Sequence, residues 1–208
     1  GAQKRAIGEA VADMRGQTPM NRLLQGDVGS GKTAVAAALM FNMAKNGYQA
    51  AIMAPTEILA EQHYYSLQKM MKNTGLKVML LTGSTPAAER RKVLQQLKSG
   101  EIDLIAGTHA LIQKTVEFHD LGLVVTDEQH RFGVAQRSAL CNKGKNPHVF
   151  VMSATPIPRT LALMIYGDLD LSVLDEMPAG RQKIETYAVG AALRKRAYTY
   201  VKKHLNAG

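Results

Sequence analysis

The residues most clearly able to do chemistry form one loop, Gly26-Asp27-Val28-Gly29-Ser30-Gly31-Lys32-Thr33. This loop matches the phosphate-binding pattern G-x-x-x-x-G-K-[ST] without a mismatch. Its glycines allow backbone N–H groups to turn inward around phosphate oxygens, and a following helix adds the positive end of its dipole. Lys32 is expected to reach the β- and γ-phosphates, and Thr33 to offer its hydroxyl to Mg²⁺. A bland glycine turn needs no Lys-Thr pair at a helix start, so we predict a site for ATP and Mg²⁺ formed by residues 26–33.

A second candidate site is the acidic pair Asp127-Glu128, which directly follows the apolar run Leu123-Val124-Val125-Thr126. An aspartate at the end of an apolar strand is where a phosphate-loop NTPase holds Mg²⁺. The adjacent glutamate is then the base that polarises the attacking water. Two solvated acids at a strand end are the ordinary alternative, which the matched phosphate loop makes less attractive.

The elements that must position these residues alternate along the chain. Helical spacing of apolar residues, helix formers and helix stop signals predict helices over 3–15, 32–45, 57–73 and 86–98. Short apolar runs predict strands over 22–25, 50–54, 77–81, 103–106, 121–126 and 148–152. Strands that are apolar on both faces and separated by helices indicate an α/β fold with a mostly parallel buried sheet and helices on both faces.

All six predicted strands end in residues that could do chemistry, namely GDVGSGKT, APT, LTG, AGTH, TDEQH and SATPIPR. In an open parallel sheet the carboxyl ends of the strands lie along one edge, where ligands bind. The sequence therefore predicts one reactive edge that carries all six junctions.

Composition sets looser bounds on the 208-residue chain. It has no apolar run near the ~20 residues of a membrane span, no export signal and a single cysteine, Cys141, which fits a reducing cytoplasm. That cysteine could be a nucleophile, although a lone helical cysteine is more often a small buried apolar group. Of the net charge of +9, +6 falls in residues 181–208, so charge alone gives weak support for a nucleic-acid partner.

Several of these junctions resemble the motifs of superfamily 2 helicases and translocases. Asp127-Glu128-Gln129-His130 is similar to the DExH form of motif II, and Ser153-Ala154-Thr155 to motif III. Residues 54–57, 81–83 and 107–109 resemble the motifs that contact the nucleic-acid backbone. With the segments 19–33, 127–134 and 153–160 the chain resembles the bacterial RecG family of branch-migration helicases, from about residue 2 to at least 181. The related transcription–repair coupling translocases usually carry Phe in place of Ser30, which favours the RecG family.

The resemblance implies a RecA-like three-layer sandwich of the P-loop NTPase class and gives individual residues roles. Gln3 matches the position that reads the adenine edge, which a glutamine amide can pair with as donor and acceptor. Gln129 and His130 match residues that sense the γ-phosphate, although His130 could be a satisfied structural histidine. Backbone-contacting positions, for which a helix-cap or turn role is nearly as good an explanation, are Pro55, Thr56, Gly83, Thr108 and His109. Coupling positions are Ser153, Ala154, Thr155 and Arg159, the last with no assigned contact.

The resemblance also implies partners. A helicase of this superfamily holds ATP between two RecA-like domains, and the second supplies arginines to the γ-phosphoryl. We expect residues 1–180 to form the first motor domain and residues 181–208 to be the interdomain linker and the start of the second, with a strand over 184–189 and a helix over 191–206. Branched or duplex DNA, the second motor domain and a wedge domain that grips the junction are the expected partners, and the protein is expected to be a monomer. Residues 1–208 alone are then expected to bind ATP–Mg²⁺ weakly and to hydrolyse ATP at a negligible rate.

Three other functions remain open at this point. A duplex translocase that couples transcription to repair, or another superfamily 2 ATPase, would carry the same motifs. A small-molecule kinase would need an acceptor pocket and an arginine-rich lid near the loop, and neither is visible in the sequence. A binding module without catalysis would have no need of the intact set Lys32, Thr33, Asp127 and Glu128.

Overall fold

The computed structural model describes residues 1–127, 134–155, 169–176 and 186–205. It divides into two compact units, Gly1–Pro178 and Ala179–Gly208. None of the helices in these described ranges combines the length and the apolar character that crossing a lipid bilayer requires.

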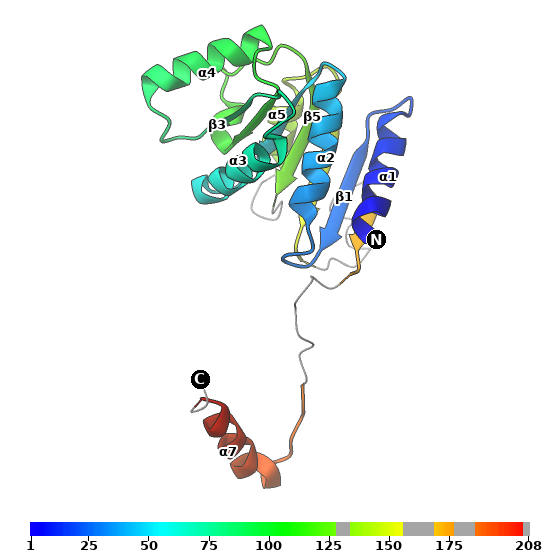
Figure 1. The fold of residues 1–208 in the computed structure, drawn as a ribbon, viewed down its shortest axis with the longest axis vertical. Coiled ribbons are helices and arrows are strands. Elements are labelled where there is room, and N and C mark those ends of the chain that lie inside the picture. Colours follow the sequence, from blue (N-terminus) through cyan, green and yellow to red (C-terminus); the bar gives the residue numbers. More distant parts are fainter. Residues whose placement is uncertain (128–133, 156–168, 177–185, 206–208) are drawn as a thin grey trace. The chain divides into compact units, whose positions relative to one another are not determined.

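The larger unit is built on a seven-stranded sheet in which every described strand pair is parallel (Figure 1). The strand order across the sheet is β3-β4-β2-β5-β6-β1-β7. The strands are β1 (Asn21–Gly26), β2 (Gln49–Met53), β3 (Val78–Leu81), β4 (Leu104–Gly107), β5 (Leu121–Asp127), β6 (His148–Ser153) and β7 (Asp170–Leu174). The predicted α/β class with a parallel sheet is therefore confirmed.

Helices cover both faces of the sheet, which makes three layers. One face carries α1 (Ala2–Met14), α2 (Lys32–Lys45) and α3 (Glu57–Met71), and the other carries α4 (Ala87–Ser99), η1 (His109–Ile112) and α5 (Val134–Cys141). Strand residues alternate between the two cores, because successive side chains of a strand point to opposite faces. Ile52 and Val125 face the first core, whereas Met53 and Val124 face the second.

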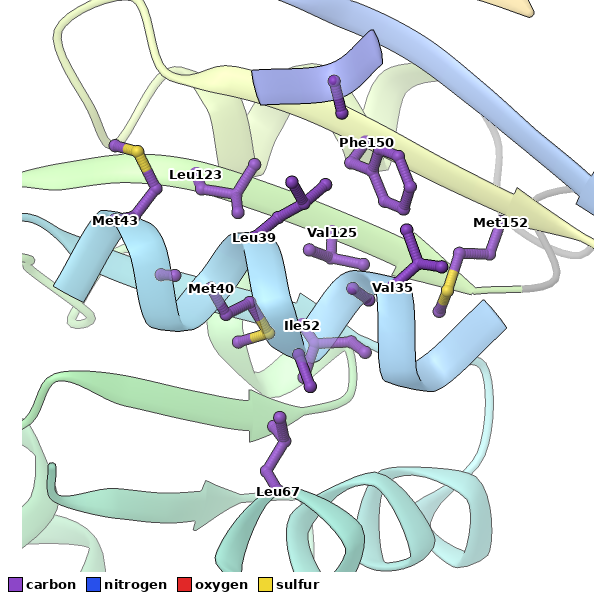
Figure 2. Packing of buried hydrophobic residues seen from close by; sticks show 14 of the residues in the cluster. Val35, Leu39, Met40, Met43, Ile52, Leu67, Leu123, Val125, Phe150 and Met152 are labelled. Carbon is purple, nitrogen blue, oxygen red and sulfur yellow. The ribbon is translucent and has the colours of Figure 1, made fainter. Parts of the chain in front are cut away.

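The first core is organised along α2. Figure 2 shows Val35, Leu39 and Met40 of this helix against Phe150 and other side chains from β2, β5 and β6. These three α2 residues are fully buried. Because the phosphate-binding loop leads directly into α2, packing of this helix fixes the direction in which the loop leaves the sheet.

The register of the sheet aligns the strand ends. Hydrogen-bonded partners place Leu81, Gly107, Met53, Thr126, Val151 and Leu23 in one row across six strands. Asp127, Met152 and Leu24 form the next row. Each predicted junction begins within a few residues of these rows, so the pairing confirms the prediction that all six junctions lie along one edge of the sheet. We call this edge the catalytic rim.

The opposite edge has a structural role, which Gln49 at the start of β2 illustrates. Its buried amide donates to the carbonyls of Leu97 and Ile102, at 2.9 and 2.8 Å, and its oxygen accepts from the backbone N–H groups of His119 and Asp120. A buried amide with both of its polar atoms paired fixes the backbone of three neighbouring segments. This edge therefore supplies control positions remote from the catalytic rim.

A buried charge joins α1 to the sheet. Arg22 of β1 is 7% exposed, and its Nε donates to Asp13 Oδ2 at 2.6 Å. Its Nη1 donates to Ser172 Oγ of β7 at 2.9 Å and lies 3.5 Å from Glu9 Oε2, and the Ser172 hydroxyl donates to Glu9. The sequence alone identified Arg22 only as a strand residue, since its partners lie in a helix and in a strand 150 residues away.

Replacing Arg22 by alanine should lower the free energy of unfolding by about 3 kcal/mol, because the change leaves two partly buried carboxylates without their cation. We expect the lower part of the range known for buried pairs, since Glu9 and Asp13 keep part of their surface in water. Urea denaturation followed by circular dichroism measures the change. Arg91→Ala on the exposed side of α4 is the matched control, expected within about 0.5 kcal/mol of the original protein. Equal stability of the two variants would contradict the role given to Arg22.

The structure corrects two details of the predicted elements. Strand β7 was not predicted; it pairs with β1 at the edge of the sheet, and its exposed Asp170 and Val173 dilute the apolar pattern. The strand predicted over 184–189 is wrong for the described residues 186–189, which have no regular structure. A strand is stable only with a pairing partner, and Tyr187 and Val189 are exposed instead.

The smaller unit contains η3 (Ala191–Leu193) and α7 (Arg194–Leu205), which match the helix predicted over 191–206. No residue of α7 is buried. Its apolar side chains Tyr198, Val201 and Leu205 lie at helical spacing, and all are more than half exposed. An apolar stripe of this kind is typical of a helix that packs against a further element.

Candidate nucleotide and nucleic-acid site

The phosphate-binding loop has the backbone that its glycines were predicted to provide. Gly29 and Gly31 have φ angles of 81° and 90°, and Gly31 is the N-cap of α2. The φ of Gly31 strains any residue with a side chain, and a Cβ there would also lie 2.1 Å from Nε2 of Gln3 and force that amide to move. The loop therefore ends at the N-terminus of α2, where the backbone N–H groups and the helix dipole favour binding of an anion.

Lys32 lies over this loop. Its ammonium donates to the carbonyl oxygens of Gly26 at 2.7 Å and of Asp27 at 2.9 Å. Carbonyl acceptors are weaker than phosphate oxygens for a cationic donor, so a bound triphosphate would attract the same ammonium more strongly. Val28, which the pattern leaves unspecified, is 73% exposed at the tip of the loop.

Gln3 contacts the loop from α1, where its Nε2 donates to the carbonyl of Ser30 at 2.8 Å. The first turn of α1 is itself fixed, because Ala2 N donates to Glu176 Oε1 at 2.8 Å. Arg5 donates to Asp175 Oδ1 and to the carbonyl of Val173, and its guanidinium lowers the pKa of Asp175. Gln3 is thus held at the loop by contacts to the end of β7, although it is the third residue of the chain.

Asp127 lies at the end of β5, two strands from β1 in the sheet. Its Oδ2 lies 2.8 Å from Nε2 of His63, a buried residue of α3. A carboxylate only accepts hydrogen bonds, so His63 Nε2 carries the hydrogen. Sequence reasoning missed His63 because it lies on the buried side of α3 with Ala60, Leu67 and Met71, where it looks like an ordinary core residue.

The residues present fit a nucleotide with Mg²⁺. Magnesium is usually held by one or two carboxylates, with phosphate and water oxygens completing its shell, and Asp127 and Thr33 offer suitable oxygens at the rim. The hydroxyl of Ser30 is buried without a hydrogen-bond partner among the described residues, which is unusual outside a binding site. A cavity of about 320 Å³ opens beside the loop and is lined by Gln25, Gly26, Asp27, Ala154, Val173 and Leu174.

The predicted backbone-contacting residues cluster at the carboxyl ends of β2, β3 and β4. Thr56 is exposed and caps α3 by accepting from Leu59 N at 3.3 Å. Glu57 accepts from Ser84 N at 3.0 Å and Ser84 Oγ at 2.6 Å, and these contacts, led by the hydroxyl, lower the pKa of Glu57. His109 is exposed and close enough for its charge to lower the same pKa further. Glu57 therefore ties two of the predicted motifs together.

The residues of this cluster differ in how far they are exposed to solvent. Gly83 is exposed, whereas Pro55 is half-buried at the junction after β2. Thr108 is 2% exposed, and its hydroxyl accepts from Ala110 N at the start of η1. Thr108 thus sets the course of the chain into His109, which is the side chain of this junction that faces solvent.

The junction after β6 is held by hydrogen bonds between its own residues. Ser153 Oγ and Thr155 Oγ1 lie 2.9 Å apart, and Thr155 N donates to Ser153 Oγ at 3.2 Å. Ala154 lines the cavity beside the phosphate-binding loop. The three described coupling residues, Ser153 to Thr155, therefore lie next to the loop, through the pairing of β6 with β1. Glu128, Gln129, His130 and Arg159 lie outside the described residues.

Cys141 ends α5 and packs against the second core. Burial raises the pKa of its thiol, which disfavours the reactive thiolate. This agrees with the role of a small apolar group.

A parallel sheet with a glycine loop after β1, a lysine over that loop and an aspartate after β5 defines a P-loop NTPase domain with the RecA-like fold. The chain belongs to the DEAD/DEAH box helicase family, whose model matches residues 2–164. It is 55% identical over its whole length to the ATP-dependent DNA helicase RecG of Bacillus subtilis, and 51% identical to that of Thermotoga maritima. It spans 30% and 26% of those two proteins.

Solved structures agree with this placement. RecG bound to a three-way DNA junction is 48% identical to the chain and matches it with a TM-score of 0.81, covering 100% of this chain and 28% of that one. The helicase domain of Pyrococcus furiosus Hef matches with a TM-score of 0.64 at 22% identity, over 82% of this chain and 36% of that one, which shows a shared fold. The predicted resemblance to the RecG family is therefore confirmed.

Proposed function

We propose that the chain is the ATP-binding motor domain of an ATP-dependent DNA helicase or translocase that acts on branched DNA. One observation carries the proposal: the sheet register brings the glycine loop and a second cluster, whose residues resemble backbone-contacting motifs, to the same rim. The RecG relatives are named as DNA helicases, and one solved RecG is bound to a three-way junction. A small-molecule kinase would have no use for the second cluster.

On the nucleotide side, residues 26–33 would bind ATP and Gln3 would contact the adenine edge. Lys32 would neutralise the β- and γ-phosphates, and Thr33 and Asp127 would hold Mg²⁺. The bound metal would neutralise the charge of the phosphates. Glu128 would accept a proton from the attacking water, with Gln129 and His130 sensing the γ-phosphate.

On the DNA side, Pro55, Thr56, Gly83 and His109 would contact the phosphodiester backbone, and Thr108 would support His109 by capping η1. Hydroxyl and backbone N–H contacts of this kind carry no base information, which suits a motor that moves along any sequence. Ser153, Ala154, Thr155 and Arg159 would couple this surface to the loop. The described coupling residues, Ser153 to Thr155, follow β6, which is next to β1 and its loop, whereas the DNA cluster follows β2, β3 and β4.

The smaller unit would be the start of a second motor domain that closes over the nucleotide, with residues 1–180 forming the first. Its exposed stripe of Tyr198, Val201 and Leu205 supports this proposal, since such a helix needs a partner. A wedge domain elsewhere in the protein would grip the junction, and the protein would act as a monomer.

The function is tested by ATPase assays of the protein at its full natural length with different nucleic acids. Three-stranded and four-stranded branched DNA should raise the turnover number well above the values with linear duplex DNA and with RNA. Stimulation by a stalled transcription complex, and not by branched DNA, would instead identify a transcription–repair coupling translocase. Equal rates with and without DNA would overturn the proposal.

His109→Ala should weaken binding to branched DNA about 3–10-fold, because it removes one exposed donor from the rim. Nucleotide binding without DNA should stay unchanged, since His109 lies after β4 and away from the loop. Fluorescence anisotropy with a labelled junction measures the affinity. His119→Ala is the matched control, an exposed histidine whose backbone is fixed at the opposite edge by Gln49. A weaker affinity in both variants would argue against a specific contact at His109.

A further inference from the structure

The contact between His63 and Asp127 joins the two halves of the site. Asp127 is the proposed metal ligand, and the side chains of Asp127 and His63 are only 14% and 7% exposed. Their hydrogen bond of 2.8 Å spans 64 positions in the sequence. It therefore depends on the packing of α3 against the sheet and not on local structure.

Helix α3 is fixed at both ends, which makes it a rigid support for His63. At its start, Thr56 caps the helix and Glu57 accepts two hydrogen bonds from Ser84. Towards its end, Leu67 and Met71 are buried in the first core. A helix held at both ends keeps the backbone of His63 at a fixed place relative to Asp127, within reach of the observed hydrogen bond.

An ordinary core residue does not explain this position. His63 takes a place in the buried stripe of α3 between Ala60 and Leu67, where an apolar side chain would pack without the desolvation that an imidazole requires. The hydrogen bond from its Nε2 to Asp127 Oδ2 offsets part of that desolvation. A hydrogen bond from a neighbour of this kind orients a carboxylate that serves as a metal ligand.

We propose that His63 is a positioning residue that fixes the Asp127 carboxylate for Mg²⁺–nucleotide binding and ties it to the helix that begins at the DNA cluster. The inference rests on the proposed function of the loop and of Asp127. It assigns His63 no contact with nucleotide or metal. Its effect is on the concentration of Mg²⁺ that the site requires.

The test uses His63→Asn and His63→Gln in the protein at its full natural length. The two variants are equally polar, but only the glutamine amide places a donor as far from the backbone as Nε2 of histidine. Binding of a fluorescent, non-hydrolysable ATP analogue is measured in EDTA and as a function of Mg²⁺, with the melting temperature recorded for each variant. His63→Asn should raise the half-saturating Mg²⁺ concentration about 10–100-fold, with the affinity in EDTA unchanged. His63→Gln should return it to within about 3-fold of the original protein.

An unchanged Mg²⁺ requirement in His63→Asn would overturn the inference. So would a parallel loss of affinity in EDTA and in Mg²⁺, since that indicates a general loss of packing. Lys32→Ala is measured alongside to separate the two proposals. If the original protein binds no nucleotide, or Lys32→Ala binds it equally well, then the proposed function itself fails; if both behave as expected and only the His63 variants do not, the failure belongs to this inference.

Discussion

Lys32→Ala is expected to weaken nucleotide binding by about 10²-fold or more. The ammonium lies over the loop, 2.7 Å from the carbonyl oxygen of Gly26, where no other side chain of the described loop offers a positive charge. Hydrogen bonds to charged groups contribute about 1.5–3 kcal/mol each, and Lys32 would make two to the phosphates. Isothermal titration with an ATP analogue and Mg²⁺ measures the loss.

The fold should survive this change, because Lys32 is half-buried at the start of α2 and the helix is held by Val35, Leu39 and Met40. A matching melting temperature would establish that the effect is local. Lys114→Ala, an exposed lysine after η1, is the control and should bind nucleotide normally. Normal binding by Lys32→Ala would contradict the assignment of the loop.

Glu128→Gln is expected to lower the turnover number of the DNA-stimulated ATPase by about 10²–10⁴-fold while leaving nucleotide binding within about 2-fold. The amide keeps the size of the side chain but cannot accept a proton from water. Asp127→Asn is the informative comparison, since it should weaken Mg²⁺-dependent binding as well as turnover. Steady-state ATPase assays together with binding of the non-hydrolysable analogue separate the two steps.

Glu61→Gln on the exposed side of α3 serves as the control for the loss of one carboxylate and should be near normal in both assays. If Glu128→Gln retains turnover, another group must activate the water. If it loses binding to the same extent as Asp127→Asn, then the division of roles between the two acids is wrong.

Local signals in the sequence were sufficient for most of the fold. The glycine loop, the start of α2 at Lys32 and its end at Lys45 were predicted from residues adjacent to one another. The position of the rim also followed from the sequence, because a parallel sheet brings all strand ends to one edge whatever the strand order. The order of the strands and the pairing of β1 with β7 did not follow.

The features that could not be predicted from the sequence are contacts between residues far apart along the chain. His63 has the spacing of a core residue, and its meaning lies in Asp127 on another element. Arg22 looks like a polar interruption of β1, and its acceptors are in α1 and β7. Thr108 was predicted as a backbone-contacting position, but its hydroxyl is occupied by a cap, as turn residues often are. The wrong strand over 186–189 has the same cause, since strand formation depends on a neighbour.

The position of β1 between β6 and β7 has a consequence for how the protein is made. Within the larger unit β1 is synthesised well before both of its sheet neighbours, β6 and β7, and Arg22 meets Ser172 across 150 residues. At about 5–20 residues per second, the synthesis of that interval takes about 8–30 s. The nucleotide loop therefore cannot acquire its folded surroundings until most of the larger unit has been translated. A nascent chain stalled before β7 would leave the backbone N–H and C=O groups along one edge of β1 unpaired, which favours aggregation.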